Sequence, residues 1–227
     1  MLTREAQEKI FKRFIAKPLR KSINSNFSFE HLDEQFKDSI DNTEKYSAVI
    51  YFDICNFSSK VQAFTSAQVK DYLEEFYQET MIYIKKYKGQ IDKIMGDGII
   101  VVFSTVFKEI TSDIDASNNT FCCCKELIEN LNNTDFEIKA SIGCGKLFFC
   151  KTGVEQIYEE FTAVGYPYTV AYRLESIAEK NQILLMNNTA LSKRVKISND
   201  YLNQWEQKNF IMNLKGLNTN VIHRLQY

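Results

Sequence analysis

Two aspartates stand where apolar, strand-like runs of the sequence end, and their carboxylates could bind hard cations. Asp53 closes YSAVIYFDI, and Asp97 lies in the MGDG link of the hairpin-like stretch IDKIMGDGIIVVF. If these runs lie side by side, both carboxylates reach one end of a sheet, as oxygen ligands for the divalent cations of phosphoryl transfer. The turn ICNF after Asp53 could add backbone N–H groups for a phosphate. Taken singly, Asp53 could instead cap the next segment, and Asp97 could serve only a tight Asp-Gly turn.

Three further motifs carry groups suited to a phosphate-bearing ligand. Lys93 lies four residues before Asp97, hence on the same side of an extended strand, where it needs an acidic partner, a ligand or an edge open to solvent. Thr169 and Arg173 are spaced i, i+4, so a helix would present a hydroxyl and a guanidinium together to a phosphate oxyanion, unless the arginine is an ordinary exposed one. Lys215 stands at the tip of the last predicted hairpin, as a turn lysine or a phosphate contact.

The periodicity of the apolar residues predicts the elements that must position these groups. A helix opens at the capping box of Thr65 and Gln68 and closes at Gly89. The remaining predicted elements are a buried strand over 46–53, the hairpin over 91–103, a helix over 113–132, an alternating strand in FEIKASIGCG, a helix over 168–179, the strand NQILLM and a hairpin over 210–225. This order predicts an α+β fold with a ferredoxin-like βαββαβ core, helices on one face of an antiparallel sheet, and additional C-terminal strands.

Residues 1–40 are predicted to form an N-terminal helical extension. An apolar stripe at helical spacing is made by Ile10, Phe11, Phe14, Ile15 and Leu19. Lys, Ser and Asn dominate the connector over 21–26. We expect this extension to be a packing or dimerising arm without chemistry of its own.

Composition excludes several classes of function. The 227 residues include 28 basic and 29 acidic side chains, a balance that gives no electrostatic case for a nucleic-acid polymer or an anionic membrane as partner. No apolar run approaches the roughly 18 residues that span a bilayer, and the charged start MLTREAQEKIFKRF is unlike an export signal, so we expect a cytoplasmic protein. The 6 cysteines form no C-x-x-C pair and only 2 histidines are present, so zinc binding and Ser-His or Cys-His catalysis find little support. We expect the cysteines of FCCCKELI to be reduced and partly buried.

Five separated segments together resemble the catalytic domain of class III nucleotidyl cyclases. They are YFDICNFS, IDKIMGDGIIVVF, IKASIGCGKLFF, VGYPYTVAYRLES and NLKGLNTNVIHRL, and they follow one another in the order and approximate spacing of that family between Tyr46 and Leu225. The GGDEF turn of the diguanylate cyclases, which share the fold, is absent from the sequence. The resemblance implies a catalytic domain over 41–227, after the extension over 1–40.

The resemblance also implies a homodimer with two active sites, each built across the interface. Asp53, Ile54 and Asp97 of one protomer would bind two divalent cations, Mg²⁺ or Mn²⁺. The other protomer would bring Thr169 and Arg173 to the reaction, an in-line attack of the ribose 3′-oxygen on the α-phosphorus that releases pyrophosphate. The substrate-binding residues that the resemblance implies are Lys93 and Thr162 for the base, Lys215 for the triphosphate, Tyr51 and Phe57.

Departures from the family pattern bear on activity and on the base. Thr169 replaces the usual asparagine of the catalytic helix, and Tyr166 and Tyr168 add bulk near the pocket. Tyr51 and Phe52 precede the first aspartate, where the family often has a small residue. Lys93 can only donate a hydrogen bond, whereas Thr162 can donate or accept, so this pair is compatible with adenine, uracil or cytosine.

The compact architecture and the aromatic bulk resemble the stand-alone pyrimidine cyclases of Pycsar anti-phage systems. Those enzymes make cyclic UMP or cyclic CMP to activate a separate effector. We therefore expect a pyrimidine cyclase, with uridylate ahead of cytidylate. An adenylate cyclase and a degenerate domain that binds nucleotide without turnover are the alternatives. Guanylate is disfavoured, because Lys93 replaces the family's base-reading glutamate.

Overall fold

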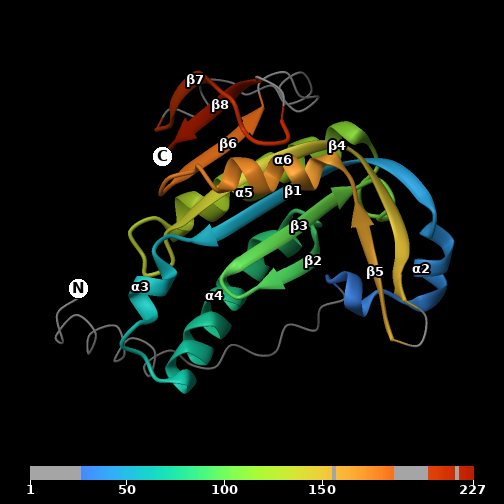
Figure 1. Ribbon diagram of the computed structural model, residues 1–227, viewed down its shortest axis with the longest axis horizontal. Helices are drawn as coiled ribbons and strands as arrows, with labels where there is room; N and C mark the ends of the chain where they lie inside the picture. The colour runs from blue at the N-terminus through green and yellow to red at the C-terminus, as the bar shows by residue number, and fades with distance from the viewer. Residues whose placement is uncertain (1–26, 155–156, 187–203, 218–219) are drawn as a thin grey trace.

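The helices and strands follow one another in nearly the predicted order (Figure 1). The structure is a computed structural model that describes residues 27–154, 157–186, 204–217 and 220–227, so the predicted stripe over 10–19 lies outside the described residues. The helical elements are η1 (Phe29–His31), α2 (Glu34–Ile40), α3 (Phe57–Val61), α4 (Ser66–Lys86), α5 (Asp113–Leu131) and α6 (Tyr166–Glu175). The strands are β1 (Thr43–Ile54), β2 (Gln90–Met95), β3 (Gly98–Ser104), β4 (Ile138–Val154), β5 (Tyr158–Val164), β6 (Gln182–Met186), β7 (Glu206–Met212) and β8 (Asn220–Gln226).

The first four strands form the predicted ferredoxin-like core. Within the described residues the sheet has 8 strands, and its path is β2-β3-β1-β4-β6-β8-β7. The neighbours β2-β3, β3-β1 and β1-β4 are all antiparallel, whereas β6 runs parallel to β4. β5 folds back on the second half of β4, and the two strands project as an arm beside α2 (Figure 1). These pairings confirm an α+β fold extended by C-terminal strands.

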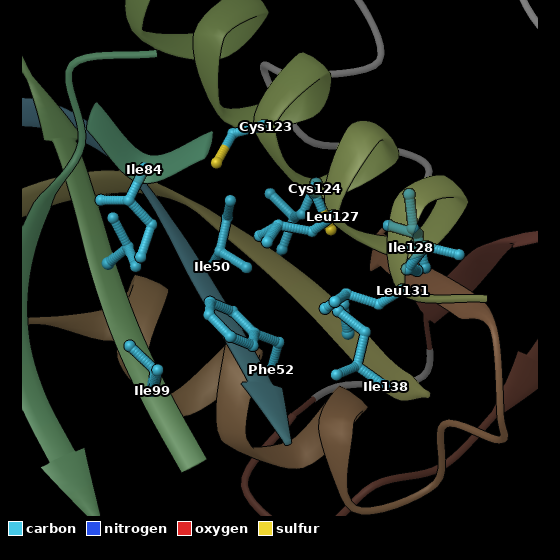
Figure 2. Packing of buried hydrophobic residues seen from close by; sticks show 14 of the residues in the cluster. Ile50, Phe52, Ile84, Ile99, Cys123, Cys124, Leu127, Ile128, Leu131 and Ile138 are labelled. Carbon is cyan, nitrogen blue, oxygen red and sulfur yellow. The ribbon is translucent and has the colours of Figure 1, made fainter. Parts of the chain in front are cut away.

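Helices cover both faces of the sheet, where one covered face was predicted. On one face, α4 and α5 pack on Ile50 and Phe52 of β1, and Figure 2 shows Leu127 of α5 in this core. The intervening Val49 points to the other face, because side chains alternate along a strand, and it packs with Ala171 of α6. The sheet is therefore sandwiched between the α4–α5 layer and α6.

The strand β4 is buried more continuously than its predicted alternation suggests. Ala140, Ser141 and Ile142 are consecutive and each is 0% exposed, because helices cover both of its faces. Gly143 lets α6 approach closely, since a Cβ there would lie 2.0 Å from the Pro167 carbonyl oxygen. Pro167 itself lies in the first turn of α6, as predicted.

The capping box that opens α4 is confirmed, but the glycine after this helix has a different role from the one predicted. Thr65 and Gln68 exchange both capping hydrogen bonds. The residue with the left-handed backbone is Lys88, at φ 63°, and not Gly89. Gly89 is needed for packing instead, because a Cβ there would lie 2.5 Å from Val101 Cγ1.

Two further features of the described residues concern the cysteines and the character of the helices. All 6 cysteines are free, and of the three on α5, Cys123 and Cys124 are buried and Cys122 is half-buried. Figure 2 shows Cys124 beside Leu127 in the core and Cys123 on the side of Ile84. In the part of the chain that the structure describes, no helix has the length and apolar character that a membrane crossing needs.

Candidate active site

Asp53 and Asp97 lie next to each other at one end of the sheet, as predicted. β1 pairs with β3 so that Phe52 is opposite Ile99, which brings Asp53 to the tip of the β2–β3 hairpin. Burial, a side-chain hydrogen bond with Asp97 and the charge of Asp97 raise the pKa of Asp53 to about 7. Two adjacent carboxylates that are partly withdrawn from water resist simultaneous ionisation unless a cation joins them.

The hairpin turn that presents Asp97 differs by one position from the predicted Asp-Gly turn. Met95 pairs with Gly98, so the two loop residues are Gly96 and Asp97. Gly96 takes φ +65°, which is the requirement at the first position of a type II′ turn. Gly98 is small for another reason, because a Cβ there would lie 2.9 Å from the Tyr51 ring. Asp97 is therefore a turn residue, and its carboxylate lies beside that of Asp53.

The carboxylate pair fits a divalent cation that is also held by phosphate or water. Mg²⁺ usually binds to one or two carboxylates and takes its other ligands from phosphates and water. Among the described residues, no three or more His, Cys, Asp or Glu side chains converge as a metal site. The Ile54 side chain is buried at 1% exposure, so only its backbone can take part in such a site.

A lysine that sequence reasoning missed lies beside this pair. Lys139 of β4 is directly opposite Asp53 of β1, and its Nζ is 4.0 Å from Asp53 Oδ2. The same Nζ is 2.8 Å from Oε1 of Glu175, the buried last residue of α6. Lys139 thus ties the end of α6 to the carboxylate pair. Only the β1–β4 register, which the local sequence does not contain, reveals this contact.

Two tyrosines form a wall beside the carboxylates. The Tyr51 and Tyr172 ring centroids are 4.9 Å apart, and the Tyr172 hydroxyl lies 3.8 Å from Met95 Sδ. Burial and the charges of Glu175 and Asp53 raise the pKa of Tyr51. The wall therefore stands at the hairpin tip, with Tyr51 predicted from the sequence and Tyr172 missed.

The two predicted base-reading residues lie close together, and each already has an acidic partner. Lys93 Nζ is 2.9 Å from Glu160 Oε1 on β5. Burial opposes the charge of this lysine, but the Glu160 hydrogen bond and the Asp92 charge raise its pKa overall. Thr162 is only 3% exposed, and its hydroxyl donates to Asp92 Oδ1 at 3.2 Å. Lys93 is thus neither a free edge lysine nor an unpaired buried one.

The predicted catalytic pair lies on the outer face of α6. Val170 and Leu174 are buried at 1% and 0% exposure, whereas Thr169 and Arg173 are exposed. Neither the Thr169 nor the Arg173 side chain forms a hydrogen bond or ion pair with another residue that the structure describes. This outer face of α6 is open to a ligand or a second chain.

Two further predicted substrate-binding residues, Lys215 and Phe57, lie on other elements than α6. Lys215 is exposed in the turn between β7 and β8. The Phe57 ring packs against Tyr72 with centroids 6.2 Å apart, so only the backbone of Phe57, at the start of α3, can face a phosphate. Asn56 before it has φ 58° and makes no capping hydrogen bond with its side chain.

Comparisons with known proteins agree with the fold described above. The sequence model of one protein family, the adenylate and guanylate cyclase catalytic domain, matches residues 41–224. The solved adenylyl cyclase CyaB from P. aeruginosa is 19% identical, with a TM-score of 0.69 over 82% of this chain and 95% of that one. The guanylate cyclase domain of RhGC from Catenaria anguillulae, solved with GTP, is 18% identical, with a TM-score of 0.66 over 81% of this chain and 98% of that one. Such identities establish a shared fold. Comparison with curated protein sequences gives no match.

Proposed function

The chain belongs to the family of adenylate and guanylate cyclase catalytic domains, and we propose on this premise that it is a nucleotidyl cyclase. The reaction would convert a nucleoside triphosphate into a 3′,5′-cyclic nucleotide and pyrophosphate, which makes the protein a phosphorus–oxygen lyase. The observation that carries the proposal is the juxtaposition of Asp53 and Asp97, since burial and this proximity together raise the pKa of Asp53. A fold that needed these residues only for a strand end and a turn would gain nothing from placing two carboxylates together.

Asp53 and Asp97, with the backbone of Ile54, would hold two divalent cations, Mg²⁺ or Mn²⁺. When bound, such cations neutralise the triphosphate and lower the pKa of the attacking 3′-hydroxyl. The guanidinium of Arg173 would bind the charge that develops at the α-phosphate, with the Thr169 hydroxyl beside it. Lys215 and the backbone N–H groups around Phe57 would bind the remaining phosphates.

We further propose that a second copy of the chain completes each site. Thr169 and Arg173 point outward on α6 with no partner among the described residues, which suits contacts to a triphosphate held by the aspartates of another protomer. Ile94 and Met95, which follow Lys93 on β2, are 44% and 42% exposed, although large apolar side chains are usually covered. A homodimer would cover this surface and place two sites at one interface.

The aromatic wall favours a pyrimidine base. The rings of Tyr51 and Tyr172 are in contact, with centroids 4.9 Å apart, and the Tyr172 hydroxyl lies 3.8 Å from Sδ of Met95, two residues after Lys93 on β2. A smaller single-ring base suits the reduced volume, so UTP is proposed ahead of CTP. The product would be a second messenger for a separate effector in anti-phage defence, a role that rests on the resemblance to pyrimidine cyclases alone. Adenylate cyclase is the second candidate, since Lys93 suits N1 of adenine equally well.

One assay tests the activity and the base together. The purified chain is incubated with Mn²⁺ and each of the four nucleoside triphosphates, and cyclic nucleotide and pyrophosphate are measured. We expect cyclic UMP or cyclic CMP as the main product, and its loss in Asp97→Asn. Nucleotide binding without pyrophosphate release from any triphosphate would instead identify a degenerate domain. A main product of cyclic AMP would reject the pyrimidine preference and keep the cyclase.

A further inference from the structure

Asp92 is a largely buried carboxylate that has no part in the function proposed above. It lies at a β-bulge, where the register of β2 with β3 shifts between Ile91 and Lys93. Its Oδ2 accepts a hydrogen bond from the Tyr168 hydroxyl of α6 at 2.8 Å, and its Oδ1 accepts one from the Thr162 hydroxyl of β5 at 3.2 Å. One carboxylate therefore joins the three elements that carry the proposed base-reading and catalytic residues. We call Asp92, Thr162 and Tyr168 the Asp92 cluster.

The Asp92 cluster places a carboxylate at a largely buried position, where an apolar side chain is more usual. Burial raises the pKa of Asp92, and the hydrogen bonds from Tyr168 and Thr162 together with the Lys93 charge oppose this rise. Apolar side chains of similar volume often hold strands and helices together as well as a buried charge does. Packing alone therefore gives no reason for a carboxylate at this position, next to Lys93.

The hydrogen-bond directions in the cluster have a consequence for recognition. A hydroxyl has one proton, and Tyr168 gives its proton to Asp92, as does Thr162, whose other acceptor, the Ala163 carbonyl oxygen, is farther away at 3.5 Å. Burial and the Asp92 charge raise the pKa of Tyr168, so this phenol keeps its proton and remains a donor to Asp92. The cluster therefore has no proton left to donate to a ligand, and its remaining lone pairs can accept hydrogen bonds from one. Thr162, which by its side-chain type could donate or accept, is thereby restricted to accepting.

We propose that Asp92 is a positioning residue for base recognition, which sets the Asp92 cluster as a pure hydrogen-bond acceptor beside the donor Lys93. A base would then need to present an N–H group to the cluster and an acceptor atom to Lys93. Uracil offers N3–H with O4, and cytosine offers its 4-amino group with N3. Adenine offers the same pair with its 6-amino group and N1, so this requirement sets the orientation of the base, and the proposed pocket volume separates pyrimidine from purine. This inference rests on the proposed nucleotide binding and concerns the base, not the triphosphate.

The test compares ligands with and without a base on the full chain. Isothermal titration measures the binding of UTP, CTP, ATP and inorganic tripolyphosphate, with Ca²⁺ as a cation that supports binding. Asp92→Asn keeps the size of the side chain but replaces one acceptor oxygen with an NH₂ donor. One of the two hydroxyls can then no longer donate to residue 92 and becomes able to donate to the base. We expect this variant to bind the preferred triphosphate about tenfold more weakly, as for a misdirected buried hydrogen bond. Tripolyphosphate should bind within about twofold of wild type, because it has no base to read.

Two further variants separate recognition from folding. Tyr168→Phe removes one donor and no charge, so it should keep the tripolyphosphate affinity and lower base discrimination less than Asp92→Asn does. Glu126→Gln is the matched control on the opposite side of the sheet, since Glu126 also accepts from a tyrosine, Tyr87 at 2.6 Å, and from Lys86. We expect Glu126→Gln to bind every ligand as wild type does.

A base analogue gives an independent readout. The triphosphate of N3-methyluridine lacks the N3–H group, so wild type should bind it at least tenfold more weakly than UTP, and Asp92→Asn should show little difference between the two. Equal loss of tripolyphosphate and nucleotide binding in Asp92→Asn or Tyr168→Phe would overturn the inference, because it would show a structural role. Unchanged nucleotide binding in Asp92→Asn would overturn it too. Wild type that binds nucleotides selectively but releases no pyrophosphate would refute the cyclase and leave this inference standing.

Discussion

The rings of Tyr51 and Tyr172 are in contact, with centroids 4.9 Å apart and an interplanar angle of 59°. Tyr51 lies on the β1 strand that ends at Asp53, and Tyr172 directly precedes Arg173 on α6. Tilted aromatic pairs of this kind add about 0.5–1.5 kcal/mol beyond their burial. Gly98 of the hairpin packs against the Tyr51 ring so closely that a Cβ there would lie 2.9 Å from it. The two rings of the wall are therefore held between the hairpin and α6.

Removing one ring of this wall should change base selectivity. We expect Tyr172→Ala to raise kcat/KM for ATP relative to UTP by about tenfold, since pocket volume alone discriminates by one to two orders of magnitude. Competition between ATP and UTP, with both cyclic products quantified, measures the ratio. Tyr172→Phe keeps the ring and should keep the wild-type ratio. An unchanged ratio in an active Tyr172→Ala enzyme would mean that the wall does not limit the base.

Removing one carboxylate of the pair should abolish turnover and spare the fold. Asp97→Asn is expected to lower kcat by about 10²–10³-fold, as for the loss of one strong transition-state contact. Its Tm without metal should equal or exceed that of wild type, because the repulsion with Asp53 is gone. Asp71→Asn, at an exposed position of α4, is the control and should change neither quantity. A wild-type rate in Asp97→Asn would show that the hairpin serves only the fold.

The raised pKa of Asp53 predicts a pH dependence of stability. The pKa of Asp53 is 3.8 in the unfolded chain and about 7 in the folded one. Between these values the folded state holds a proton that the unfolded state has lost, so the free energy of unfolding falls as pH rises. Denaturant unfolding of the metal-free protein is measured at pH 5 and at pH 8. From pH 5 to pH 8 the free energy of unfolding of wild type should fall by more than that of Asp53→Asn. Parallel changes in the two proteins would contradict the raised pKa.

Cation binding should show the opposite dependence on pH. Divalent cations bind the ionised carboxylates, so Mn²⁺ must displace the proton that Asp53 keeps below pH 7. The apparent Mn²⁺ affinity should rise by about tenfold from pH 6 to pH 8, about fivefold of it below pH 7, and then level off, the dependence expected when one proton is released near a pKa of about 7. Titration calorimetry at pH 6, 7 and 8 measures it. Asp53→Asn should bind Mn²⁺ weakly and without this dependence.

Local patterns in the sequence were enough to predict that Asp53 and Asp97 lie close together. Asp53 ends an apolar, β-branched run, and Asp97 lies in a short link between two such runs, so each residue could be placed by its neighbours along the chain. The antiparallel pairing of β1 and β3 then brought the two ends together. Thr169 and Arg173 were equally accessible to prediction, because i, i+4 spacing and the apolar Val170 define the exposed face of α6.

The missed contacts depend on register and on the docking of α6. Lys139 meets Asp53 only because β1 and β4 pair in one particular register. Asp92 reaches Tyr168 because of a bulge in β2 that no turn residue marks. One local signal for the docking of α6 was present and not used, since Gly143 within a buried strand indicates close approach of another backbone. With that signal, the second covered face of the sheet could have been predicted.

Mixing two inactive variants tests whether each site needs two protomers. Asp97→Asn lacks one proposed metal ligand, and Arg173→Ala lacks the proposed transition-state contact of the partner. If each site takes its aspartates from one protomer and its arginine from the other, a mixed dimer has one site with both intact and one site with neither. Equal mixing makes about half of the dimers mixed, so about a quarter of the wild-type activity should return. The variants are unfolded and refolded together, or co-expressed with different tags, and assayed with UTP and Mn²⁺. If each protomer builds its own site instead, the mixture will be as inactive as the separate variants.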